Sequence, residues 1–342
     1  MNRKQFTGAA ATILASLMTG AHGNSMGLMP ASSVETGAHP PYLQPGDTIG
    51  IVTPAGPISL DEIQPAVKKL QQWGFSVKIG SSVGKKEFTF GGTDEERRDD
   101  MQSMLDDSSI RAIICGRGGY GLVRIMDQLD FSLFRKKPKW IIGFSDITLM
   151  HNLLQCSFSC ASIHAKMCNS FPADWAHADP LQIESIETIK DAIVGKKLEY
   201  KVTAQENNRF GMASGILTGG NLRVFESQIG TSTDPNTSNK ILFLEDADEY
   251  LYNIDRMFWH LKQAGKLSGL NGLIIGGFRT RPDDPGEEFA YDIHRIVLEK
   301  VRDFSFPVCF GFPVGHQKHN LALKYGMKCH LSVSEQGVVF TQ

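Results

Sequence analysis

Short apolar segments alternate with helix-like amphipathic segments through the first half of the chain. Residues 47–53 form an apolar run that ends at a Pro-Ala-Gly-Pro breaker, and the stretch after it repeats apolar residues at helical spacing. The same order recurs, with further apolar runs at 75–79, 111–115 and 139–144. Because strands that alternate with helices favour parallel pairing, we predict a mostly parallel sheet with flanking helices over residues 45–200.

The second half of the chain has a different pattern. A polar stretch at 196–209 predicts a connection to a second unit. In that unit, apolar runs at 241–244 and 272–278 predict strands, and an amphipathic stretch at 252–264 predicts a helix. The expected fold is therefore α/β, with a second, smaller, mixed α/β domain over residues 210–342.

The first residues have the features of a targeting segment. Arg3 and Lys4 precede an apolar stretch at 6–19 that is too short to span a bilayer comfortably, and small residues follow it. We expect a signal peptide over 1–23, a linker rich in Gly, Ala, Ser and Pro over 24–44, and hence an exported, periplasmic protein. A buried amphipathic helix is the alternative interpretation.

Composition narrows the class of partner. The 342 residues are 41% hydrophobic and 21% charged with a net charge of −2, which is typical of a globular protein. No basic run indicates binding to nucleic acid or to an anionic membrane. None of the six cysteines has the CxxC spacing of a zinc site. Some could pair in an oxidising compartment, whereas most are expected to be small buried apolar residues.

Open α/β sheets place their sites at the carboxyl ends of strands, and one such end carries the segment Gly143-Phe144-Ser145-Asp146. A serine on a sharp strand-to-helix turn exposes its hydroxyl, and the amide after it lies at a helix N-terminus. The segment matches part of a nucleophile elbow, although its second glycine is replaced by Ile147. A serine that only caps the helix is the alternative.

A second strand end carries the Gly-rich loop, residues 116–121, which formally matches GxGxxG. The loop follows the third strand rather than the first, and no acid ends a following strand at the right distance. We therefore favour a set of backbone amides for an oxyanion over a dinucleotide site.

An acid and a histidine in the second half complete the candidates. Glu245 ends an apolar strand, where a carboxylate is costly unless it serves a site or an ion pair, and His316 lies in a Gly-flanked loop. A structural histidine is the alternative. Glu245 together with Asp246, Asp248 and Glu249 could indicate a divalent cation, but the glycine of a calcium loop is absent. Asp248 and Glu249 are instead expected at a helix N-terminus. The order Ser, Glu, His is one of several that build the same catalytic geometry.

Seven motifs together resemble the serine LD-carboxypeptidases, a family that includes the microcin C immunity peptidases. They run in the family's order from about residue 46 to residue 326: GDTIGIVTPAGP, FGGTDEER, GRGGYG, GFSDIT, GGNL, LEDADEYLYNIDR and GFPVGH. The resemblance implies a two-domain protein in which Ser145 is the nucleophile, Glu245 the orienting acid and His316 the base.

The same resemblance implies binding roles for three further residues. The amides of Gly119 and Asp146 would form the oxyanion hole, and Asn221 would lie near the cleft. The family's usual substrate is the muropeptide tetrapeptide stem, cut between the L-centre of meso-diaminopimelate or lysine and the terminal D-alanine. One branch instead hydrolyses an amide-like linkage in peptidyl or aminoacyl nucleotides.

We therefore expect a serine carboxypeptidase that acts through an acyl-enzyme on a small peptide. The resemblance implies no metal and no cofactor, and it implies a homodimer; no membrane association is expected after signal removal. A non-catalytic periplasmic solute-binding protein is an alternative from another class, and a nucleotide-dependent oxidoreductase rests only on the GxGxxG match.

Two segments depart from the family pattern. His164-Ala165-Lys166-Met167 replaces His-Gly-Pro-Met, and the lysine could add a positive charge near the cleft and change which carboxylate or side chain is accepted. Residues 323–326 lack the proline that the family tends to have there.

Overall fold

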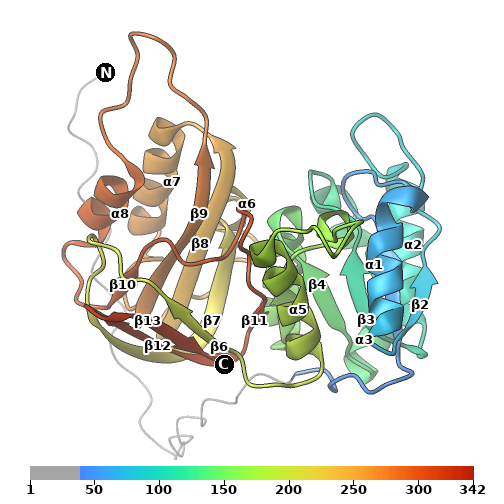
Figure 1. Cartoon of the computed structure of the whole chain (residues 1–342). Helices are drawn as coiled ribbons and strands as arrows, with labels where there is room; N and C mark the ends of the chain where they lie inside the picture. Colours follow the sequence, from blue (N-terminus) through green and yellow to red (C-terminus); the bar gives the residue numbers. More distant parts are fainter. Residues whose placement is uncertain (1–38) are drawn as a thin grey trace, which may run out of the picture. The chain divides into compact units, whose positions relative to one another are not determined.

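The computed structural model describes residues 39–342, so the predicted signal peptide at 1–23 and most of the predicted linker lie outside the described residues. Two sheets organise the described part of the chain (Figure 1). The first has six strands in the order β11-β5-β4-β3-β1-β2, and the second has seven in the order β10-β9-β8-β7-β12-β13-β6. Both are accompanied by helices, which confirms the predicted α/β class.

The first sheet is parallel except for one edge strand. Its parallel strands are β1 (Thr48–Val52), β2 (Ser76–Ile79), β3 (Ile110–Cys115), β4 (Trp140–Gly143) and β5 (Ser162–His164). The antiparallel edge strand is β11 (Leu323–Tyr325). The accompanying helices are α1 (Leu60–Gln72), α2 (Asp94–Asp106), α3 (Ser132–Lys136), α4 (Thr148–Phe158) and α5 (Pro180–Ile193).

Helices bury both faces of this sheet. Apolar residues of α1 and α5 pack on one face, and those of α2, α3 and α4 pack in a separate cluster on the other. Capping boxes start α1 and α2, because Ser59 and Thr93 each accept from the amide three residues on while the glutamate there bonds back. A sheet covered on both faces explains the continuous apolar runs of its strands.

The second sheet is mixed. A parallel group consists of β7 (Gly211–Asn221), β8 (Lys240–Glu249), β9 (Gly272–Thr280) and β10 (Val308–Cys309). An antiparallel group consists of β12 (Lys328–Ser334), β13 (Gly337–Thr341) and β6 (Glu199–Val202). Three helices pack on one face in a single apolar cluster: α6 (Leu222–Ser227), α7 (Leu251–Gln263) and α8 (Ile293–Val301).

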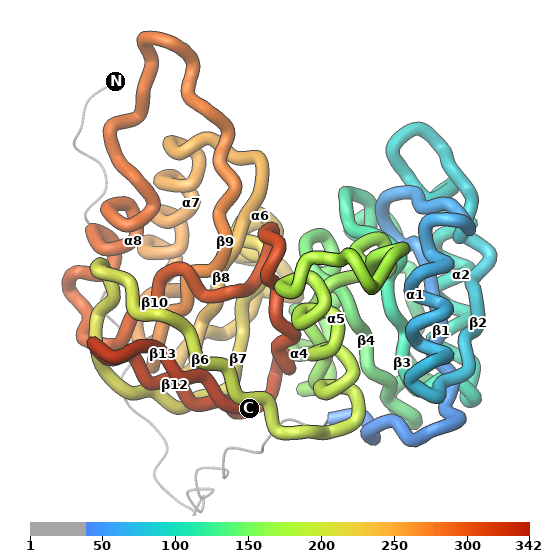
Figure 2. Tube along the Cα trace, viewed as in Figure 1, coloured from blue at the N-terminus to red at the C-terminus, as the bar shows by residue number. Residues whose placement is uncertain are grey.

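The two sheets share a core and a strand crossover. One apolar cluster contains Ile163 of the first sheet and Phe243 of the second, together with Tyr325 of β11. Figure 2 traces the red, C-terminal part of the chain as it returns to the green part of the first sheet before it forms β12. Sequence analysis assigns this segment to the second domain, and the domain boundaries stay a prediction.

Two further findings concern the described residues. The six cysteines are all unpaired, and only Cys156 is exposed. None of the helices among residues 39–342 is long and apolar enough to cross a membrane.

Candidate active site

The predicted nucleophile lies on a strained turn. Strand β4 ends at Gly143, and Ser145 has a φ of +63°, in the left-handed region that a non-glycine residue rarely adopts. A short 3₁₀ turn, Ser145–Ile147, then leads into α4. A Cβ on Gly143 would lie 2.8 Å from Ile147 Cγ1, so a glycine is needed for this tight approach. The strain costs about 1 kcal/mol or more, and such strain clusters at functional sites.

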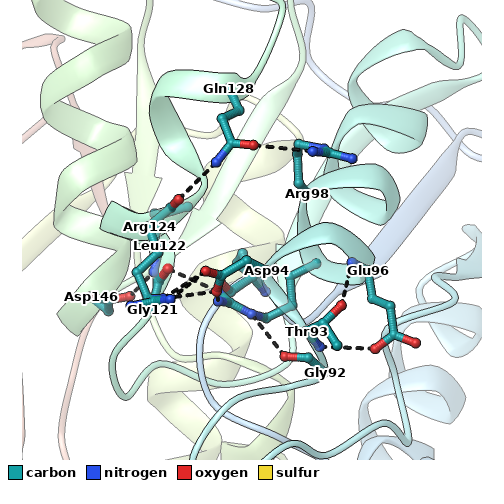
Figure 3. Close-up of polar contacts among 12 residues, drawn as sticks. Gly92, Thr93, Asp94, Glu96, Arg98, Gly121, Leu122, Arg124, Gln128 and Asp146 are labelled. Carbon is teal, nitrogen blue, oxygen red and sulfur yellow. Dashed lines mark hydrogen bonds and ion pairs between the residues drawn. The ribbon is translucent and has the colours of Figure 1, made fainter.

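The Gly-rich loop lies against this turn. A Cβ on Gly118 would be 3.1 Å from the Cβ of Ser145, and Gly119 has a left-handed φ of +105°. Asp146 anchors the end of the loop, because its Oδ2 accepts from the amide of Leu122 at 2.9 Å (Figure 3). Burial raises the pKa of Asp146 to about 6, although this hydrogen bond opposes the rise.

The predicted acid and base contact each other directly. Glu245 of β8 is fully buried, and its Oε2 accepts from His316 Nδ1 at 2.5 Å and from the His316 amide at 3.2 Å. Since Nδ1 donates to the carboxylate, Nε2 is the nitrogen left to accept a proton. The Gly315 that precedes the histidine has a φ of +95°, and a Cβ there would lie 2.5 Å from Glu245 Oε2. Only glycine allows the loop to approach this closely.

The charges around His316 favour its protonated form. Burial by itself would lower the pKa of His316, but the hydrogen bond that its Nδ1 donates to Glu245 and the charges of Glu245 and Asp246 outweigh it, so the pKa is raised above its usual value. Asp246 is also buried, which raises its pKa to about 7 against the opposing hydrogen bond from the Arg223 amide. The base therefore lies in a field that stabilises its charged form.

Asn221 lies where the two sheets meet. Its amide donates to Thr148 Oγ1 at 3.1 Å, which joins the end of β7 to the start of α4. Its side-chain oxygen accepts from Val224 and caps α6. A Cβ on Gly220 would lie 2.6 Å from the same threonine oxygen, so this approach is also close.

Five of the six residues predicted for the site line one cavity of about 590 Å³, which we call the active-site cavity: Gly119, Ser145, Asp146, Asn221 and His316. Glu245 is absent from the lining and lies behind the histidine. The ring centroids of Phe144 and His316 are 5.0 Å apart, so His316 lies beside the turn that carries Ser145. A larger hollow of about 770 Å³ on the second sheet contains none of the six.

The structure alters two expectations. Lys166 does not line the active-site cavity; its Nζ donates to Gln317 O at 2.7 Å, and so it joins the end of β5 to the histidine loop. Asp248 and Glu249 are not helix N-terminal residues, because β8 continues through Glu249 and α7 begins only at Leu251. Pairing with β9 extends the strand beyond its apolar part.

Three arginines in the cavity lining were missed: Arg117, Arg223 and Arg279. Arg117 lies within the motif GRGGYG, Arg223 directly follows the motif GGNL, and Arg279 directly follows the predicted strand that ends at 278. Their location within or directly after these segments was the signal that could have identified them. Among residues 39–342, no group of three or more His, Cys, Asp or Glu side chains is arranged to hold a metal ion.

Comparisons with known proteins identify the family of this chain. The family model described as the LD-carboxypeptidase N-terminal domain matches residues 49–165, and the one described as the LD-carboxypeptidase C-terminal domain matches residues 214–331. The probable murein peptide carboxypeptidase of Bacillus subtilis (strain 168) is 31% identical over 305 residues, covering 88% of this chain and 93% of that protein. The murein tetrapeptide carboxypeptidase of Pseudomonas aeruginosa is 27% identical, covering 81% of this chain and 91% of that protein.

Solved structures give the same result. The muramoyltetrapeptide carboxypeptidase from Oxalobacter formigenes superposes with a TM-score of 0.75 at 26% identity, covering 86% of this chain and 98% of that one. The microcin C7 self immunity protein MccF has a TM-score of 0.77 at 22% identity, covering 89% and 98%, and shows a shared fold. Since family models cover most of both halves, this chain belongs to the LD-carboxypeptidase family and is a peptidase, a hydrolase.

Proposed function

We propose that this peptidase is a serine-type LD-carboxypeptidase that releases the terminal D-alanine from muropeptide tetrapeptide stems. The observation that carries the proposal is the hydrogen bond from His316 Nδ1 to the buried Glu245, beside a cavity that also contains the strained Ser145. The murein-peptide names of the relatives from B. subtilis and P. aeruginosa support the substrate class.

The first half-reaction is acylation. Ser145 Oγ attacks the carbonyl carbon of the scissile amide while its proton passes to His316 Nε2, and the carbonyl electron pair moves to the oxygen. The amides of Gly119 and Asp146 donate to that oxyanion. When the intermediate collapses, the C–N bond breaks and the proton on Nε2 passes to the leaving amine. D-Alanine departs, and the remaining peptide is an ester on Ser145.

The second half-reaction is deacylation. Water attacks the ester carbonyl and gives its proton to Nε2, and the collapse of the second intermediate returns that proton to Ser145 Oγ. One water is consumed for each amide bond broken. Glu245 holds the imidazole in the tautomer that accepts at Nε2 and stabilises the imidazolium that forms in both steps.

The test is incubation of the protein with a purified tetrapeptide, followed by mass spectrometry. Loss of one alanine mass is expected with the unaltered protein, and Ser145→Ala should lose at least about 10³-fold in turnover. Full activity in Ser145→Ala would overturn the serine mechanism.

Other outcomes separate the alternatives. Cleavage of an aminoacyl nucleotide without cleavage of the tetrapeptide would identify the amidase branch, and tight binding of a solute without turnover would favour a solute-binding protein. Export to the periplasm and assembly as a homodimer stay predictions.

A further inference from the structure

A second cavity of about 600 Å³ adjoins the active-site cavity. Four residues line both cavities: Tyr120, Asp146, Arg223 and Val224. The lining of the second cavity includes neither His316 nor Arg279, which lie in the lining of the first. The second cavity therefore continues the first past Asp146, in a direction that leads away from the histidine.

One wall of the second cavity is held in place by a polar network (Figure 3). Arg124 donates from Nε and Nη2 to the carboxylate of Asp94, at 2.6–2.9 Å. The buried Arg97 donates to Gly121 O at 2.9 Å, and Asp146 accepts from the Leu122 amide. The chain between residues 120 and 124 is thus fixed from both sides by charged partners, and fixed geometry of this kind preorganises a binding surface.

This fixed wall presents apolar side chains to solvent. Tyr120 is 57% exposed and Val123 is 43% exposed, and both line the second cavity together with the buried Leu149. Three residues of α6 also line this cavity: Val224, Glu226 and Ser227. Exposed apolar residues gathered in a concave site are characteristic of ligand contact.

Arg223 supplies a positive charge where the two cavities meet. Its side chain is 62% exposed, and its Nη1 lies 3.6 Å from Glu226, a distance too long for a good hydrogen bond. Glu226 itself bonds to His260 at 2.6 Å. The guanidinium can therefore turn to a ligand carboxylate, for which its planar pair of donors is well suited.

The reaction geometry decides which part of the substrate reaches this cavity. His316 must give its proton to the leaving amine, so the departing amino acid lies on the histidine side of Ser145. The acyl part of the peptide must then extend the other way, past the Asp146 amide. That direction leads to the second cavity.

We propose that the second cavity is a subsite for the acyl side of the peptide substrate, namely the residues N-terminal to the one that forms the ester. It accepts a short aliphatic peptide that carries a carboxylate near Arg223. This inference rests on the proposed function.

The test compares two substrates, the tetrapeptide and N-acetyl-L-lysyl-D-alanine, which lacks the N-terminal residues. The readout is the ratio of kcat/KM for the long substrate to that for the short one. Val123→Asp puts a charge on the apolar wall and repels a carboxylate, so the ratio should fall about tenfold. Leu181→Asp, an equally exposed leucine outside both linings, should leave the ratio unchanged.

A second variant changes a residue of α6 that lines the same cavity. Ser227 is exposed on α6, so Ser227→Trp should fold and fill the cavity, and the same fall in the ratio is expected. Circular dichroism checks that both variants are folded. An unchanged ratio in both variants, or a ratio near one in the unaltered protein, would overturn the subsite.

Binding separates failure of the subsite from failure of the proposed function. The tripeptide product is titrated by calorimetry into Ser145→Ala and into the double variant with Val123→Asp. Weaker binding to the double variant would support the subsite even if the unaltered protein cleaved neither substrate, a result that would overturn the proposed function alone. Equal binding to both proteins would count against the subsite.

Discussion

The turn that carries the proposed nucleophile, Ser145, and the pair formed by the proposed acid and base, Glu245 and His316, are held in place in different ways. In both regions a buried aspartate follows the proposed catalytic residue and accepts from a backbone amide: Asp146 from Leu122 and Asp246 from Arg223. The first region relies on a strained backbone, since Ser145 has a φ of +63°. In the second region Glu245 lies within an extended strand and is held by burial and a hydrogen bond to the base.

The difference follows from what each residue must do. A nucleophile must project from the surface of its sheet into the cavity, and a left-handed turn produces that projection. An orienting acid must remain charged and fixed behind the base, which requires hydrogen-bond partners more than exposure. Backbone strain therefore holds the first region, and close packing holds the second. A substitution can disturb either one without the other.

Glu245→Gln removes the carboxylate of the second region and should have the largest effect on activity. Without the carboxylate the imidazole loses its orientation, and kcat/KM near neutral pH should fall about 10⁴-fold. Activity needs neutral His316, so it rises with pH through the pKa of this group, which Glu245 raises. In the variant burial dominates, and the acid limb of the pH profile should move to lower pH. A pH profile of the residual activity checks this.

Glu335→Gln is the matched control, because this glutamate is exposed in the β12–β13 turn. It should change neither the rate nor the profile. An acid limb that stays in place in Glu245→Gln would contradict the role of this carboxylate.

Gly315→Ala tests close packing in the second region. The added Cβ would lie 2.4 Å from Glu245 Cβ at a φ of +95°, so we expect a loss of about 2–4 kcal/mol in the free energy of unfolding, together with most activity. Urea unfolding measures the loss. Gly286→Ala has a similar φ of +84° but no atom within 4 Å, so it should lose only about 1 kcal/mol. Equal losses in both variants would mean that the clash is unimportant.

Lys166→Met tests the connection between the two regions. Methionine keeps the length of the side chain but cannot donate to Gln317 O, so the histidine loop should shift. We expect kcat to fall about tenfold with little change in KM, because positioning rather than binding is lost. Lys318→Met, at an exposed lysine nearby, is the control. A rise in KM at constant kcat would instead favour the sequence-based hypothesis that the charge of this lysine alters which carboxylate or side chain is accepted.

Ser145→Gly tests strain in the first region and has the smallest expected effect. Glycine adopts a positive φ without cost, so this variant should be about 1 kcal/mol more stable than Ser145→Ala, although both lack activity. Thermal unfolding measures the difference. Ser159 has a φ of +50° directly after α4 and lies away from the cavity, so it provides the control. Ser159→Gly should be more stable than Ser159→Ala by a similar amount, and both variants should keep their activity. Equal stability of the two Ser145 variants would show that the turn is unstrained.

The features that sequence predicted are those with local signals. The Gly-x-Ser-Asp turn is determined by consecutive residues, and the caps of α1 and α2 depend on side chains three positions apart. The extension of β8 through Glu249 could not be predicted, because it depends on pairing with β9 some 30 residues away along the chain. The contact of Lys166 with Gln317 joins positions 151 residues apart, and no local pattern encodes it.

The late return of β11 to the first sheet has a consequence for biosynthesis. This edge strand, Leu323–Tyr325, pairs with β5 and lies close to the C-terminal end of the chain. During translation the first sheet can form its parallel strands early, but its edge beside β5 stays open until residues 323–325 have been synthesised. His316 is synthesised only shortly before that strand. A product truncated before residue 316 would therefore lack both the closing strand and the proposed base, and we expect it to be inactive.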